Sequence, residues 1–249
     1  MKIILSPTKK MKEDLDFISP SDLPEFLPRT EKLLSYLRGK TPEGLQKLWG
    51  CNDAIARQNI DRLQDMDLRR RLTPAVLAYE GIAFQHMAPT VFSEQEMNYV
   101  QDHLRILSAF YGVLKPLDGI RSYRLEMQAP AAPEGFRDLY DFWGQNLYQQ
   151  VRDDSGIILN LASKEYYRCI EKYLQEGDRF ITCVFGEIVN GKLKQKATFA
   201  KMARGEMVRF LAETQTEQPE DMQKFSQLGF HFSLERSSET EYVFLRELD

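Results

Sequence analysis

The highest density of polar side chains on an apolar background lies in the block Leu107–Met127. The block contains, in order, Tyr111, Lys115, Asp118, Arg121, Tyr123, Arg124 and Glu126. Charged groups are nearly always solvated unless they are paired, so one interpretation is a surface loop with ion pairs. The alternative is a pocket wall in which Arg124 and Lys115 hold an anion. Asp118 or Glu126 would then orient the two cations.

Two short apolar segments each lead into polar residues. Lys2–Leu5 is followed by Ser6 and Lys9. A second apolar run carries Asn160 and is followed by Ser163. Open α/β sheets bind ligands beyond the carboxyl ends of their strands, so hydroxyl, amide and helix N-terminal N–H groups would converge there if the two strands are neighbours. Simple capping and turn formation is the alternative, and neither segment is a P-loop or a GxGxxG motif.

A basic patch covers residues 192–209. Its cations are Lys192, Lys194, Lys196, Lys201, Arg204 and Arg209, and with Glu206 they give a local charge of +5 in a chain of −4. Lysines on an edge strand commonly prevent edge-to-edge pairing, but that does not explain Lys201 and Arg204, one helical turn apart. Gly205 in the same helix costs about 1 kcal/mol relative to alanine, which a close backbone approach by another helix or by a ligand would explain. A patch of this size can neutralise several phosphates.

The elements that position these groups can be placed from apolar periodicity and capping residues. Strands are predicted at Lys2–Leu5, Gly156–Leu161, Arg179–Glu187 and Lys192–Lys196, and around Phe230 and Val243. Helices are predicted before Gly39, after the capping residues Thr41, Asn52, Thr73, Ser93 and Ser163, and over Asp138–Val151 and Ala197–Glu213. The dipeptide Asn190-Gly191 predicts a hairpin. The mixture predicts an α/β fold, with α+β as the alternative, in which helices cover a mixed sheet.

Composition indicates an ordinary globular chain of 249 residues, with 43% hydrophobic and 28% charged residues. Length allows one or two domains, and the only central loop-like stretch, Gln128–Gly135, could join two lobes. We expect one domain over residues 1–249, because the segments that flank this stretch look unable to build separate cores. The longest nearly apolar stretch, Ile106–Leu114, is half the roughly 18 residues that a membrane span needs. No secretory signal follows Met1, so we expect a cytoplasmic protein, without membrane contact and monomeric.

Cysteine and histidine usage argues against metal and thiol chemistry. Cys51, Cys169 and Cys183 are scattered without CxxC spacing, which does not fit a disulfide framework or a cysteine-ligated cluster. The three histidines form no HExxH or HxH pair. We therefore expect no metal and no cofactor, and no peroxidatic cysteine is recognisable.

The order of residues in Leu107–Met127 resembles that of the YaaA family of bacterial peroxide-stress proteins. The matching segments are Ser6–Lys10, Tyr111–Asp118, Tyr123–Met127, Asp138–Tyr140, Phe142–Gly144, Asn160–Ser163, Glu165-Tyr166, and Ala203–Gly205 preceded by Lys201. They follow one another in the family's order over nearly the whole chain. Thr8 replaces the usual alanine, and Glu80 and Ile82 stand where lysine and aspartate are expected.

The resemblance implies a protein that protects cells against hydrogen peroxide, with less free iron and less oxidative DNA damage. It also implies a single mixed α/β domain with a positively charged cleft that binds double-stranded or distorted DNA. A helix–hairpin–helix element is implied as well, for which the sequence offers Leu33–Gly39, Lys40-Thr41 and Pro42–Trp49.

Two functions follow from these residues. The first is a non-enzymatic DNA-binding protein that contacts phosphates through Lys194, Lys196, Lys201 and Arg204. The second is an enzyme acting on a nucleotide or a damaged nucleobase, with the acid–base candidates Asp118, Tyr123 and Glu126. Its anion-binding candidates are Ser6, Lys9, Lys115, Arg124, Asn160, Ser163, Lys201 and Arg204. An enzyme should bury this cluster in a pocket, whereas a DNA-binding protein should leave it along an open groove.

Overall fold

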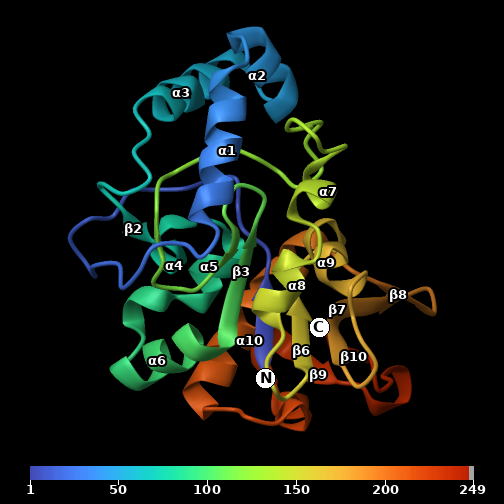
Figure 1. Ribbon diagram of the computed structural model, residues 1–249. Coiled ribbons are helices and arrows are strands. Elements are labelled where there is room, and N and C mark those ends of the chain that lie inside the picture. Colours follow the sequence, from blue (N-terminus) through green and yellow to red (C-terminus); the bar gives the residue numbers. More distant parts are fainter. Residues whose placement is uncertain (247–249) are drawn as a thin grey trace.

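One large mixed sheet organises the computed structural model, which describes residues 1–246 (Figure 1). Its strands are β1 (Lys2–Leu5), β3 (Leu104–Ser108), β4 (Gly112–Leu114), β6 (Ile157–Leu161), β7 (Arg179–Val189), β8 (Lys192–Lys194), β9 (Phe230–Phe232) and β10 (Glu241–Arg246). They lie in the order β4-β3-β1-β6-β7-β10-β9, with β8 paired to β7. A small second sheet pairs β2 (Thr73–Pro74) with β5 (Gly119–Ile120).

The centre of the sheet is parallel. Strand β1 pairs in parallel with β3 and β6, and β7 pairs in parallel with β6 and β10. Parallel sheets need cover on both faces, and Ile3, Ile4 and Leu5 are each at most 1% exposed. The predicted α/β fold with a mixed sheet covered by helices is therefore confirmed.

The helices supply the cover and connect the strands. They are α1 (Leu27–Arg38), α2 (Pro42–Trp49), α3 (Asp53–Gln64), α4 (Ala75–Ala78), α5 (Ile82–Met87), α6 (Glu94–His103), α7 (Leu139–Trp143), α8 (Asn146–Val151), α9 (Lys164–Glu171) and α10 (Ala197–Thr214). Short 3₁₀ turns occur at Pro89–Val91, Pro219–Lys224, Gln227–Gly229 and Leu234–Arg236. Figure 1 shows α1, α2 and α3 rising above the sheet at the top of the view. Among residues 1–246, no helix has both the length and the apolar character needed to cross a bilayer.

Several helices and strands begin or end where local sequence signals predict. The side chains of Thr41 and Asn52 accept hydrogen bonds from the first turns of α2 and α3, and Ser93 forms a capping box with Glu96. Asn190 and Gly191 both adopt positive φ and join β7 to β8. These predictions are confirmed because each depends on neighbouring residues alone.

Two predicted helix boundaries are wrong. Thr73 does not cap a helix: it lies in β2, and its hydroxyl accepts a hydrogen bond from the Asp14 N–H at 2.9 Å. Asp138–Val151 is not one helix, because Gly144 with φ of +53° separates α7 from α8. Both helices still bury the apolar residues that suggested a single continuous face.

The block Leu107–Met127 is mostly interior rather than a surface loop. Asp118, Arg121 and Ser122 are each at most 6% exposed, and Lys115 is the exception at the surface. The surface-loop interpretation is therefore wrong for most of this block.

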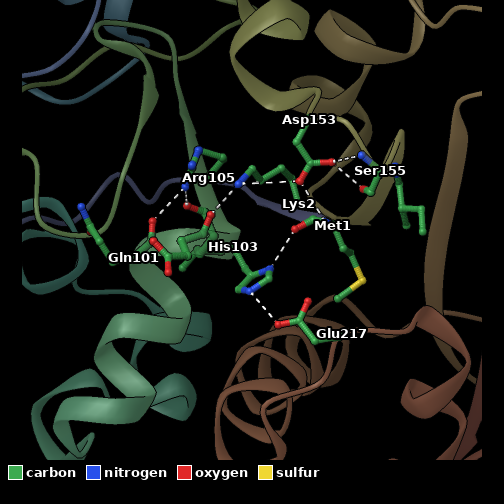
Figure 2. A network of polar contacts seen from close by, with 11 residues as sticks. Met1, Lys2, Gln101, His103, Arg105, Asp153, Ser155 and Glu217 are labelled. Atoms are coloured by element: carbon green, nitrogen blue, oxygen red, sulfur yellow. Dashed lines mark hydrogen bonds and ion pairs between the residues drawn. The ribbon is translucent and has the colours of Figure 1, made fainter.

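A network of polar contacts lies at the amino-terminal end of β1 (Figure 2). The Asp153 carboxylate accepts a hydrogen bond from the Met1 amino group at 2.9 Å and lies 3.7 Å from Lys2 Nζ. On the other side, His103 Nδ1 is 2.9 Å from the Met1 carbonyl oxygen, and its Nε2 is 3.4 Å from Glu217. These contacts anchor the amino-terminal end of β1. Its carboxyl-terminal end lies on the opposite side, where the parallel strands end.

Candidate functional site

A cavity of about 430 Å³ lies at the carboxyl ends of β1 and β6. Five segments line it: Leu5–Lys10 after β1, Gly81–Ala83 at the start of α5, Tyr123–Glu126, the residues from Leu161 to Tyr166 around the start of α9, and Lys201 with Arg204 on α10. Ligand sites of open α/β sheets are found at this position, beyond the carboxyl ends of the strands. Segments far apart in the sequence therefore meet at one site.

Ser6 and Ser163 join the two strand ends directly. The Ser163 N–H donates to Ser6 Oγ at 2.8 Å, and Ser6 Oγ donates to Ser163 Oγ at 3.2 Å. Because β1 and β6 are parallel neighbours, the predicted convergence of these hydroxyls occurs. Ser163 occupies the position before α9, but its side chain bonds Ser6 and does not cap the helix.

The cations of the cavity fall into two groups. Lys9 Nζ lies 2.7 Å from Glu126 Oε2, and Arg124 Nη2 lies 3.9 Å from Glu126 Oε1. Across residues 1–246, neither Lys201 nor Arg204 has a carboxylate within ion-pair distance. One group is therefore neutralised by the protein itself, and the other is open to an external anion.

Arg204 is the most constrained of these cations. Its Nε atom is buried without a hydrogen-bond partner, and burial lowers the pKa of its guanidinium. The Nε atom of Arg124 is also buried and unpartnered. An arginine remains charged in a protein, so a buried donor without a partner favours binding of an anion.

Tyr123 lines the cavity as a neutral hydroxyl. Its oxygen lies 2.7 Å from Ser108 Oγ and 2.9 Å from the Tyr79 hydroxyl, and its ring stacks on Phe110. Burial raises the pKa of Tyr123 to about 12, so the phenol is protonated at neutral pH. Of the three acid–base candidates, Tyr123 and Glu126 line the cavity.

Asp118 and Lys115 lie outside the cavity lining. The Asp118 carboxylate is buried and accepts a hydrogen bond from the Lys115 N–H at 2.8 Å. Burial raises the pKa of Asp118 to about 6 despite that hydrogen bond. The pair forms the turn between β4 and β5, with the Lys115 side chain exposed.

Asn160, Lys194 and Lys196 are also outside the lining. Asn160 is fully buried, where it donates to Thr182 Oγ1 at 3.1 Å and accepts from the Ala162 N–H at 2.9 Å. Lys196 Nζ lies 2.7 Å from the buried Glu187, and Lys194 is exposed on β8. Asn160 therefore shapes the end of β6, whereas the lysines belong to the hairpin.

The β7–β8 hairpin leaves the sheet at the same edge as the cavity. Strand β7 is parallel to β6, which is parallel to β1, so the far end of β7 lies at the carboxyl edge. The hairpin projects to the right in Figure 1, and α10 follows it directly. Exposed Lys192 and Lys194 thus precede the helix that carries the open cations of the cavity.

Gly81 is a cavity residue that the sequence did not single out. A Cβ at this position would lie 2.3 Å from Thr8 Cγ2, so only glycine allows the loop after β1 to rest against the start of α5. A glycine directly before a helix was the available signal. Beside it, Glu80 pairs with Lys10 at 2.9 Å at the cavity mouth.

Two of the three thiols are poor nucleophiles in this fold. Burial raises the pKa of Cys169 and of Cys183 to about 12 each, so both are protonated at neutral pH. Residues 1–246 contain no group of three or more His, Cys, Asp or Glu side chains arranged to hold a metal ion.

Comparison with known proteins matches this chain almost end to end. A family model described as peroxide stress protein YaaA matches residues 1–236. The UPF0246 protein of Agathobacter rectalis is 56% identical over 248 residues, which cover 100% of both chains. UPF0246 proteins of Limosilactobacillus reuteri and Lachnoclostridium phytofermentans are 49% identical over 245 residues and 48% identical over 246. These matches cover 98% of both chains for the first, and 99% of this chain and 96% of the relative for the second. Every segment that lines the cavity lies within the matched residues.

Proposed function

The chain belongs to the family of the peroxide stress protein YaaA, and we propose that it acts in the peroxide response by binding DNA at the carboxyl edge of its sheet. Family membership supports the general role in peroxide stress. The finer proposal is that a cytoplasmic monomer binds double-stranded or distorted DNA and so limits iron-driven damage to it.

The observation that carries this proposal is the pair of open cations, Lys201 and Arg204. They line the cavity without a carboxylate partner in the described chain, and Arg204 Nε is a buried donor without an acceptor. Phosphate oxygens are the ligands that such cations favour. Lys192 and Lys194, on the hairpin at the same edge, extend the positive surface beyond the cavity.

The salt dependence of DNA binding tests the proposal. We expect log Kobs for duplex, bubble and junction DNA to fall linearly with log salt, by about 0.9 for each phosphate contact. Lys201→Gln and Arg204→Gln should each reduce the slope for bubble DNA, whose unpaired nucleotides can reach the cavity, by about 0.9. Lys224→Gln, an exposed lysine paired with Asp221, is the matched control and should leave the slope unchanged. Absence of binding to all three DNA forms at low salt would contradict the proposal.

A second candidate function is catalysis on a nucleotide or a damaged nucleobase. It is favoured by the enclosure of the cluster in a cavity, as expected of an enzyme rather than of an open DNA-binding groove, and by the position of Glu126, whose carboxylate lies in the same cavity as the open cations. A carboxylate beside a bound anionic substrate can act as a general base. Lys9 and Arg124 would hold Glu126 in place, while Lys201 and Arg204 bind the substrate.

Survival of bacteria in hydrogen peroxide distinguishes DNA binding from catalysis by Glu126. Glu126→Gln keeps the size of the side chain and removes its proton-accepting carboxylate. If a strain with this variant at normal abundance resists peroxide as the wild type does, catalysis by Glu126 is excluded. Loss of resistance with retained DNA affinity would favour catalysis.

A further inference from the structure

The cavity contains two sets of charged side chains, called here its two parts: the cations Lys201 and Arg204, and Glu126 with the cations beside it. At one part, Lys201 and Arg204 are open cations. At the other, Glu126 is already paired with Lys9 at 2.7 Å, whereas its second oxygen is 3.9 Å from the nearest arginine nitrogen. A carboxylate has about four acceptor sites, so Glu126 Oε1 retains capacity for a further donor. A ligand that fits both parts carries an anion at one end and an N–H donor at the other.

The apolar part of the lining consists of Leu5, Pro7, Ile82, Ala83, Leu125, Leu161 and the rings of Tyr123 and Tyr166. The polar residues Ser6, Thr8, Ser163 and Glu165 also line the cavity. The volume of about 430 Å³ falls in the range of about 300–1,000 Å³ typical of small-molecule sites. A base and its sugar phosphate fit such a space, whereas a duplex does not. Nucleic acid could therefore enter the cavity only as one unstacked nucleotide.

We propose that the cavity binds a single nucleotide, with its phosphate at Lys201 and Arg204, and that Glu126 selects a base that carries an exocyclic amino group. Cytosine presents an amino group at C4, and a carboxylate is the acceptor that reads it. Uracil presents a carbonyl oxygen at the same position, which would face the Glu126 carboxylate without a hydrogen. This inference deepens the proposed function and rests on it for the source of the nucleotide.

Calorimetric titration with dCMP and dUMP tests the selectivity in the wild-type protein. The two nucleotides share the sugar and the phosphate and differ in the donor or acceptor at C4. We expect dCMP to bind about tenfold more tightly, the effect of one hydrogen bond to a charged group. Equal affinities, or a preference for dUMP, would overturn the inference without any variant being made.

Three variants test whether Glu126 is the residue that causes the selectivity. Glu126→Gln should reduce the dCMP preference to near one, because an amide can pair with either base. Arg204→Gln should weaken the binding of both nucleotides equally, by tenfold or more. Glu31→Gln is the matched control: it removes a carboxylate from an exposed ion pair with Arg69, outside the cavity lining, and should leave the preference intact. A preference that survives Glu126→Gln would overturn the role of Glu126.

Failure of the nucleotide inference can be distinguished from failure of the proposed DNA binding. If bubble DNA binds but no monophosphate binds at millimolar concentration, the nucleotide inference fails and the proposed DNA binding stands. If dCMP binds selectively but no DNA form binds at low salt, the inference holds for free nucleotides and the proposed function fails.

Discussion

Gly205 of α10 lies directly against the carbonyl oxygen of Ala83 in α5, so close that a Cβ at Gly205 would be 2.0 Å from that oxygen. Ala83 and Arg204, the neighbour of Gly205, both line the cavity. The helix contact therefore fixes the positions of these two lining residues relative to each other. It also explains a glycine in the middle of a helix, as the sequence predicted.

Gly205→Ala should force α5 and α10 apart. Overpacking of this kind costs about 1–3 kcal/mol, which exceeds the gain in helix propensity of about 1 kcal/mol. We expect a net loss in the free energy of unfolding, measured with urea, together with weaker anion binding. Gly44→Ala in α2 is the control, because its Cβ would meet no backbone atom, only the side-chain atoms Thr41 Oγ1 at 3.3 Å and Lys40 Cβ at 3.8 Å. Equal stability of Gly205→Ala and the wild type would show that the helices can separate freely.

Arg204→Met should stabilise the fold while abolishing anion binding at the cavity. Arg204 Nε is buried without a hydrogen-bond partner, so an apolar side chain of similar length removes a desolvation cost, and we expect a gain of about 1 kcal/mol. Phosphate should raise the Tm of the wild type, through linkage to binding, and leave that of Arg204→Met unchanged. Thermal scans with and without phosphate measure both effects. A variant less stable than the wild type would mean that Arg204 is satisfied within the fold.

Ser6→Ala should be more destabilising than Ser163→Ala. Ser6 Oγ accepts the hydrogen bond of the Ser163 N–H at 2.8 Å, so its removal leaves a backbone donor unpaired. A fully buried donor left unsatisfied costs about 1–3 kcal/mol, and because this one is part-buried we expect a loss at the lower end of that range. Ser163→Ala removes only the hydroxyl contact at 3.2 Å. Urea unfolding of the two variants gives the comparison, and the opposite ranking would show that the N–H finds another acceptor.

The sequence predicted the parts of the fold that neighbouring residues determine. The caps at Asn52 and Ser93 and the turn at Asn190-Gly191 depend on residues within four positions, and all three are present. The convergence of Ser6 with Ser163 followed from one topological assumption, that two buried strands are neighbours.

The burial of individual polar residues could not be predicted in the same way. Asn160 is buried because Thr182, 22 residues away, supplies its acceptor. Asp118 is buried because the Lys115 N–H in its own turn satisfies it, although its charge alone suggested solvent or a site. Apolar periodicity also predicted one continuous helix through Gly144, because the apolar pattern continues although the helix is broken there. A tertiary contact decides the position of Asn160, whereas the turn at Lys115 and the break at Gly144 are local features that charge and apolar periodicity do not register.

The reactivity of the thiols should divide the cysteines into two classes. Cys169 and Cys183 are 5% and 2% exposed, and burial raises the pKa of each to about 12. Since only the thiolate reacts, a disulfide reagent at pH 8 should modify the partly exposed Cys51 and leave the other two intact. The same reagent in urea should modify all three. Rapid native modification of Cys183 would show that the core around it opens readily.

Asp118 should make the folded state less stable as pH rises from about 4 to 6. Burial raises the pKa of its carboxyl to about 6, from 3.8 in the unfolded chain, so the folded state binds the proton more tightly in this window. Its contribution to stability is therefore fully present below pH 3.8 and is lost by about pH 6. Asp118→Asn keeps an oxygen that can accept the Lys115 N–H and removes the titration. Relative to the wild type, the variant should gain about 2 kcal/mol in unfolding free energy between pH 4 and pH 7, measured by urea unfolding. Parallel pH profiles of the two proteins would show that the Asp118 carboxyl does not titrate within this window.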